Sequence, residues 1–254
     1  MNNTTPIKAF TVATLLIVGY SLTANAATVT QGVTAMNQEQ TVADTLSARQ
    51  QAIPLIAAYM ASSQMEKLNA ALNQGLDAGL TINEAKEILV QLYAYTGFPR
   101  SLNALNELMK VVETRKQRGI SDVEGKEPVN PVPVGDELRR IGTANQTRIS
   151  GVPVQGPLFD FAPVINQFLQ THLFGDIFAR DNLDWQSREL ATVSALAATP
   201  GVEAQLLSHT RAGMRVGLTA GQLRQLVQAL REHGENDAAI RAEHALQQAL
   251  AGAK

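Results

Sequence analysis

Glu189 and His209 are the two residues whose types and spacing could do acid–base chemistry. Residues 199–201, Thr-Pro-Gly, predict a break between two helices over 188–198 and 202–216. At a rise of about 1.5 Å per residue, Glu189 lies ~15 Å before the break and His209 ~12 Å beyond it, so the side chains come level if both face the seam. A carboxylate that holds one imidazole nitrogen leaves the other free to exchange a proton with a substrate.

The same two residues also have a purely structural interpretation. Glu189 would cap or salt-bridge a helix, and His209 would be a core histidine with a satisfied hydrogen bond. The remaining histidines, His172, His233 and His244, show no partner at useful spacing and are interpreted as surface residues. Spacing alone leaves both interpretations of the pair open.

The composition narrows the chemistry further. The chain contains no cysteine, so thiol redox chemistry is excluded because no thiolate can attack a peroxide or a disulfide. A lone Glu and His leave a metal ion short of protein ligands, and we expect neither a metal nor another cofactor. The formal net charge of -2 argues against the concentrated basic surface of a nucleic-acid-binding protein.

The first 26 residues have the layout of a secretory signal peptide. Lys8 precedes the apolar run AFTVATLLIVGYSL, and Ala24, Asn25 and Ala26 form an A-x-A cleavage site. The run is shorter than the ~20 residues that span a bilayer. We therefore expect cleavage after Ala26 and a periplasmic or secreted mature protein without a membrane segment, which begins with an extension over 27–43.

The helices that carry the pair belong to a unit that occurs twice in the sequence. NQGLDAGLTINEAKEILVQL at 73–92 aligns without gaps with RAGMRVGLTAGQLRQLVQAL at 211–230, a shift of 138 positions. Gly79 and Gly217 suit the left-handed position after a helix. Thr81 and Thr219 open capping boxes for the next, amphipathic helix. We therefore predict an all-α fold, which the abundance of Ala, Leu and Gln also favours.

This repeat predicts two helical units, over 44–117 and 158–254, joined by a Pro/Gly-rich linker over 118–157. The same shift places Glu189 on Gln51 and His209 on Ala71. The first unit therefore keeps the scaffold and lacks both titratable groups.

These motifs resemble the carboxymuconolactone decarboxylase family, which shares its fold with alkylhydroperoxidase D. The C-terminal motif is His209-x-x-x-Gly213-x-x-x-Gly217-Leu218-Thr219, and the first unit carries Tyr95-Thr96-Gly97-Phe98-Pro99. The resemblance implies tandem helical units of this type. It also implies a homo-oligomer, a trimer or hexamer, in which helices of neighbouring units wall the site.

The resemblance implies two chemistries. The peroxidase branch uses a Cys-x-x-Cys pair, whose positions fall on Val202 and Gln205 here, so thiol peroxidase activity is excluded. The lactone decarboxylase branch has a histidine at the position of His209, which would supply or relay a proton while Glu189 orients the imidazole.

An anionic substrate also needs a cation. Arg188, Arg211 and Arg100 are the substrate-binding candidates nearest in the sequence. The leading hypothesis is a cofactor-free acid–base enzyme of the decarboxylase or lyase type that acts on a small anionic or lactone substrate. The alternative is a non-catalytic, exported, oligomeric protein that binds a small molecule.

Overall fold

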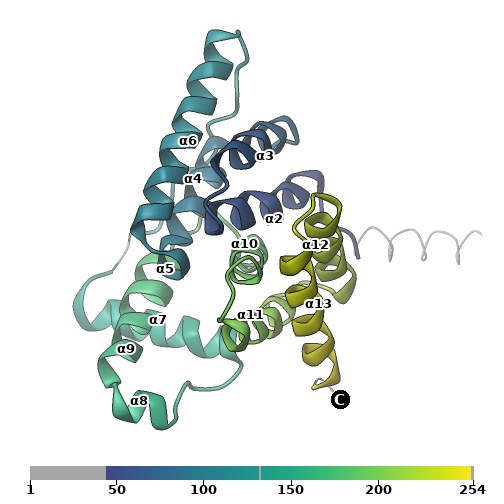
Figure 1. Cartoon of the computed structure of the whole chain (residues 1–254). Helices are drawn as coiled ribbons and strands as arrows, with labels where there is room; N and C mark the ends of the chain where they lie inside the picture. The colour runs from purple at the N-terminus through teal and green to yellow at the C-terminus, as the bar shows by residue number, and fades with distance from the viewer. Residues whose placement is uncertain (1–43, 132, 253–254) are drawn as a thin grey trace, which may run out of the picture. The chain divides into compact units, whose positions relative to one another are not determined.

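The computed structural model describes residues 44–131 and 133–252, and within them every regular element is a helix (Figure 1). The prediction of an all-α fold is confirmed. The predicted signal peptide and the extension over 27–43 lie outside the described residues. No helix in the described part of the chain is long and apolar enough to cross a membrane.

The helices fall into three groups along the chain. The N-terminal half, residues 44–117, contains α2 (Ala48–Ala61), α3 (Met65–Asp77), α4 (Ile82–Gln91), α5 (Tyr93–Thr96) and α6 (Phe98–Gln117). A middle group contains α7 (Gly135–Ser150), α8 (Pro157–Phe161), α9 (Pro163–Phe168) and the π-helix η1 (Leu169–Ile177). The last group is α10 (Trp185–Ala197), α11 (Glu203–Arg215), α12 (Ala220–Glu232) and α13 (Asn236–Ala251).

Helix boundaries in the first and last groups follow the 138-residue shift. Both ends of α11 lie 138 positions after those of α3, and α12 and α13 begin 138 positions after α4 and α6. Gly79 and Gly217 have φ angles of 91° and 107°, a left-handed backbone that glycine adopts without a steric cost. Both predicted capping boxes are present, because Thr81 and Thr219 each accept the N–H group three residues on.

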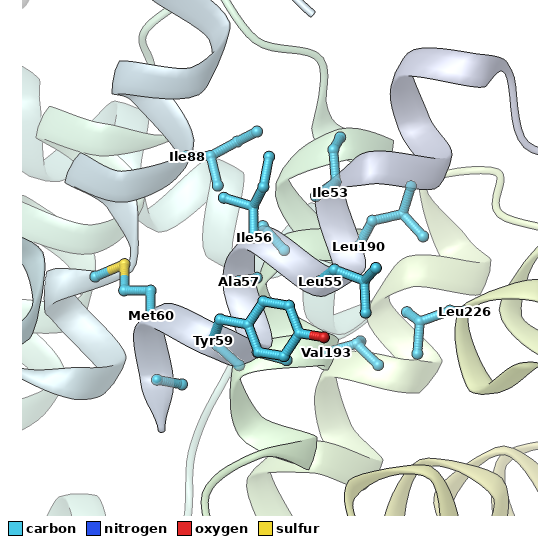
Figure 2. Packing of buried hydrophobic residues seen from close by; sticks show 14 of the residues in the cluster. Ile53, Leu55, Ile56, Ala57, Tyr59, Met60, Ile88, Leu190, Val193 and Leu226 are labelled. Carbon is cyan, nitrogen blue, oxygen red and sulfur yellow. The ribbon is translucent and has the colours of Figure 1, made fainter. Parts of the chain in front are cut away.

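The two halves share one hydrophobic core built around α2 and α10, which pack against each other. Figure 2 shows side chains from α2, α4, α10 and α12 in this core, among them Ile53, Ile56, Ile88, Leu190, Val193 and Leu226. Each large apolar side chain buried in this way contributes roughly 1.5–3 kcal/mol. Both halves, residues 44–117 and the C-terminal helices α10 to α13, thus supply this core. A second, smaller cluster contains residues of α7, of η1 and the position directly after it, and of α11: Ile149, Leu173, Phe174, Ile177, Phe178 and Ala212.

The interpretation of 118–157 as a linker is wrong for its second part, since α7 is a helix of 16 residues. The helix packs on η1, and a Cβ at Gly142 would collide with the carbonyl oxygen of Gln170. The Asn145 side-chain amide donates to the carbonyl of Phe174 at 2.8 Å. A glycine contact and hydrogen bonds give little apolar periodicity, which explains why the sequence indicates only a short helix within this stretch, over ELRRIG at 137–142.

Candidate active site

The structure brings Glu189 of α10 and His209 of α11 together. The distance from His209 Nδ1 to Glu189 Oε2 is 2.9 Å, which confirms the expected meeting of the two side chains. Gly213 lies at this contact, where a Cβ would stand 3.6 Å from Glu189 Cβ, an ordinary van der Waals distance, and 3.1 Å from Leu218 Cδ1. The tighter packing at Gly213 is therefore against Leu218 in the turn that follows α11.

The two members of the pair differ in exposure. Glu189 is completely buried, whereas 15% of the His209 side chain is exposed. An ionised carboxylate only accepts hydrogen bonds, so Nδ1 carries the proton in this contact and Nε2 is the nitrogen left for another partner. The second carboxylate oxygen of Glu189, Oε1, is buried and has no hydrogen-bond partner. A buried acceptor without a partner costs free energy, and such groups are rare outside functional sites.

Tyr95 of α5 is the third member of the site, and no role was predicted for it from the sequence. Its ring meets the His209 imidazole in a T-shaped contact with 5.2 Å between ring centroids. Its hydroxyl is buried without a well-formed hydrogen bond. Burial raises the pKa of the Tyr95 phenol far above its usual value, and the nearby Glu189 carboxylate raises it further. The phenol is therefore neutral near neutral pH.

The motif around Gly97 explains how Tyr95 is placed. Gly97 has a φ of 85° and forms the sharp turn between α5 and α6, which a side chain would strain. Its N–H group donates to the carbonyl of Tyr93 at 2.8 Å. The Thr96 hydroxyl donates to the carbonyl of Leu92 at 2.9 Å and ties α5 to the end of α4. In the sequence, the only indication of this placement is that Tyr95 is the aromatic residue just before the Gly97 turn.

A second imidazole–carboxylate contact lies on the π-helix, where His172 Nδ1 is 2.6 Å from Asp176 Oδ2. The interpretation of His172 as a residue without a partner is therefore wrong, and the i, i+4 spacing carried the signal. The ring of His172 lies 5.5 Å from that of Tyr93, which stacks on the exposed Phe98. The side chains of His172 and Asp176 are 46% and 40% exposed, far more than those of Glu189 and His209.

The substrate-binding prediction for Arg188 does not fit the structure. Its side chain is completely buried, and its guanidinium donates to Glu87 Oε1 and Gln91 Oε1, each at 2.9 Å. Burial lowers the pKa of Arg188, and the Glu87 carboxylate acts against this shift. Gln91 in turn donates to the Arg188 carbonyl at 2.9 Å. Arg188 is thus a buried cation that joins α10 to α4. Its Nε–H group has no hydrogen-bond partner, but it is buried and therefore out of reach of an anionic substrate at the surface.

The other two predicted cations are exposed. Arg100 donates to the carbonyl of Thr96 at 2.9 Å, and the Arg211 guanidinium lies beside Gly252. Neither makes a hydrogen bond to Glu189 or His209. Within the described residues no group of three or more His, Asp or Glu side chains is arranged to hold a metal ion.

Fold and site together define an all-α protein with a buried carboxylate next to a partly exposed imidazole. Residues 163–249 match the family model described as Carboxymuconolactone decarboxylase family. This region contains Glu189 and His209 and belongs to that family, so the resemblance seen in the sequence is confirmed. The family indicates a carboxymuconolactone decarboxylase-like or alkylhydroperoxidase D-like function. No curated protein matches the chain.

The match begins at α9 and ends in α13. It does not extend over residues 44–117. The interpretation of that half as a second copy of the family unit therefore stays a prediction, supported by the common helix boundaries.

Proposed function

We propose that the protein is a cofactor-free acid–base enzyme of the decarboxylase or lyase type, which acts on a small anionic or lactone substrate. The observation that carries this proposal is the 2.9 Å contact between His209 Nδ1 and the buried Glu189 carboxylate. It fixes the position of Nδ1 and leaves Nε2 available. A positioned imidazole contributes roughly 100-fold to 10,000-fold to a proton transfer.

In the proposed reaction the substrate carboxylate leaves as carbon dioxide. The electron pair of the broken carbon–carbon bond stays on the substrate as a dienolate, and His209 donates a proton from Nε2 to the dienolate carbon. Glu189 stabilises the imidazolium before this transfer, because its charge lies next to Nδ1. Solvent then returns the proton to the imidazole. Arg100 and Arg211 are the proposed contacts for the substrate anion, and Arg188 is no longer among them.

The test is a turnover assay on a panel of lactone acids and keto acids in deuterated water. We expect carbon dioxide release with deuterium at the product carbon. His209→Gln should lower kcat/KM by roughly 100-fold or more, and Glu189→Gln should lower it less. His244→Gln is the matched control, since His244 is exposed and lies on α13. Unchanged turnover in His209→Gln would rule out the proposed mechanism.

The alternative function is non-catalytic binding of a small molecule by an exported, oligomeric protein. One observation favours this alternative. Arg188, the cation nearest to the pair in the sequence, is buried in an ion pair with Glu87 and does not face a substrate. The two functions separate in a binding assay. A ligand that binds in a His209-dependent manner and is recovered unchanged would support the alternative. Mass measurement of the exported protein, with Ala27 expected at its N-terminus, tests the proposed periplasmic or secreted location.

We also propose that the protein forms a homo-oligomer, a trimer or hexamer, through α8 and α9. These two helices have no buried residue, and they expose Leu158, Phe161, Val164, Ile165 and Phe168. Contiguous exposed apolar side chains are typical of interfaces between proteins. Native mass spectrometry should show an oligomer that the double substitution Phe161→Asp and Phe168→Asp dissociates. Ile240→Asp, on an exposed position of α13, is the control and should leave the oligomer intact.

A further inference from the structure

The site contains a residue from outside the family-matched region. Glu189 and His209 lie within residues 163–249, but Tyr95 belongs to α5 in the N-terminal half. Its ring is perpendicular to the imidazole, with 86° between the planes. Its buried hydroxyl interacts with Thr192 of α10, without a well-formed hydrogen bond, and lies close enough to Glu189 for the carboxylate charge to raise the pKa of the phenol. The N-terminal half thus contacts the imidazole directly and lies near the carboxylate.

We propose that Tyr95 is a positioning residue for the Glu189–His209 pair, so that the site is completed only when the two halves of the chain pack together. This inference deepens the proposed function, because it concerns the same pair. It assigns a role to a residue outside the part of the chain that carries the acid–base groups.

The need for such a residue follows from the geometry of the pair. One hydrogen bond, from Nδ1 to Oε2, fixes a single point of the imidazole and leaves the ring free to tilt about that bond. An aromatic ring packed at right angles against it removes this freedom, and such contacts contribute about 0.5–1.5 kcal/mol beyond burial. The ordering is established before a ligand arrives, which lowers the cost of reaching the reactive arrangement.

The hydroxyl of Tyr95 is buried within range of the Glu189 charge, which raises the pKa of the phenol. Because the phenol is neutral, it adds a dipole next to Glu189 without adding a second negative charge. The other charged group that affects this phenol is Arg188, whose charge is balanced by Glu87. The His172–Asp176 contact on η1 faces Tyr93 and not Tyr95. Glu189 is therefore the charge on which the hydroxyl chiefly acts.

Tyr95 is itself held firmly, as a positioning residue must be. The α5 helix is bonded to α4 through Thr96 and turns into α6 at Gly97. The Ser101 hydroxyl of α6 donates to the carbonyl of Leu89 at 2.8 Å, so that α6 is bonded to α4 as well. The orientation of Tyr95 is thus set by three helices of the N-terminal half.

The experiment uses nitrogen-15 NMR of histidine side chains in the intact chain, which has four histidines. His209 is assigned by the signal that disappears in His209→Gln. In the wild type we expect a slowly exchanging Nδ1 proton with the shift of a hydrogen bond to a carboxylate. In Tyr95→Leu this proton should exchange with water roughly tenfold faster or become unobservable, an effect of about 1.4 kcal/mol or more.

Two further variants separate positioning from folding. Tyr95→Phe keeps the ring, so it should restore slow exchange, but loss of the hydroxyl beside Glu189 should move the Nδ1 proton shift. Tyr93→Phe is the matched control on the same helix and should change neither quantity. If Tyr95→Leu does not fold, the shift in Tyr95→Phe decides the question. Wild-type exchange and shift in the Tyr95 variants that fold would overturn the inference.

This test needs no substrate and no turnover. If no substrate is turned over but the Tyr95 variants change the exchange and shift of the Nδ1 proton, the proposed enzymatic function is wrong and the inference about Tyr95 holds. If turnover depends on His209 but the Tyr95 variants leave the Nδ1 proton unchanged, the proposed enzymatic function holds and the inference about Tyr95 is wrong.

Discussion

The N-terminal and C-terminal halves of the protein place the same helices at the same spacing but carry different side chains where the pair lies. Gln51 and Ala71 occupy the positions of Glu189 and His209. The Gln51 amide donates to the carbonyl of Leu46 at 2.9 Å, and Ala71 is buried in the core. The contact between the two helices therefore forms without a carboxylate or an imidazole, which argues for a role of the pair other than holding helices together.

The region around Gln51 shows what the N-terminal half has instead. A surface pocket is lined there by Leu46, Gln51, Leu55, Gln225 and His233, together with other residues of α12. By the 138-residue shift, Gln51 corresponds to Glu189, Gln225 to Glu87, and His233 to Tyr95. At the position that corresponds to Tyr95, this pocket therefore has His233. The Nδ1 atom of His233 lies 2.9 Å from the carbonyl oxygen of Ala229. Related helices produce a pocket with glutamines at the positions of Glu87 and Glu189 in one half and an acid–base pair in the other.

The largest difference between the halves should appear at Glu87 and its counterpart Gln225. Glu87→Ala leaves the guanidinium of Arg188 buried without its counter-charge, and loss of one partner of a buried ion pair costs about 3–5 kcal/mol. Gln225→Ala loses only the bond that Gln225 accepts from the N–H group of Leu46 at 2.7 Å, which costs about 1 kcal/mol. Urea unfolding measures both. Equal losses would show that the Arg188 network adds nothing to the core.

The glycines at the two helix seams should also respond differently to a methyl group. A Cβ at Gly75 would meet three side-chain atoms at 3.1–3.4 Å, so Gly75→Ala should destabilise the protein by about 1–3 kcal/mol. At Gly213 a single atom, Leu218 Cδ1, lies that close, and alanine gains about 1 kcal/mol in helix propensity. Thermal unfolding should therefore rank Gly75→Ala as the more harmful change. The reverse ranking would mean that the seam beside Glu189 is the tighter one.

The two capping boxes should be interchangeable in stability. Thr81→Ala and Thr219→Ala each remove the acceptor for the N–H group three residues on, and each should cost about 1 kcal/mol. Chemical unfolding of the two single variants checks this. If the two variants differ in unfolding free energy by well over this amount, the two turns have the same geometry but contribute differently to stability.

The smallest expected effect is a pH dependence confined to the N-terminal half. The Asn69 amide donates to Glu107 at 2.6 Å and, more than any other cause, lowers the pKa of the Glu107 carboxyl below 4.5. A pKa lowered on folding adds stability above the unfolded pKa that is lost as the pH falls through the folded pKa. In the C-terminal half, Leu207 corresponds to Asn69 and Ala245 to Glu107, and neither side chain can be ionised.

Asn69→Leu should therefore reduce the difference in urea midpoint between pH 7 and a pH below 4.5. Leu207→Ala is the control, and it should lower stability equally at both pH values. An unchanged pH difference in Asn69→Leu would show that the Asn69–Glu107 bond does not contribute to acid sensitivity.

Local patterns made much of this protein predictable. The glycine–leucine–threonine turns and their capping boxes appear as expected, because such turns depend on residues a few positions apart. The meeting of Glu189 and His209 was predictable too, since a single helical break and a fixed rise per residue bring the two positions level. Only a short part of α7, over residues 137–142, is indicated by the sequence, because its packing on η1 relies on Gly142 and on polar side chains, which leave little apolar period to detect.

The sequence by itself determined the helical class, the turn positions and the family of residues 163–249, because each depends on residue types and spacing within one stretch of chain. Only the tertiary structure decided that Arg188 is buried against Glu87 and that Tyr95 packs on His209. Both contacts join residues about 100 positions apart across the shared core. No local periodicity encodes which side chains meet when α2 and α10 bring the two halves together.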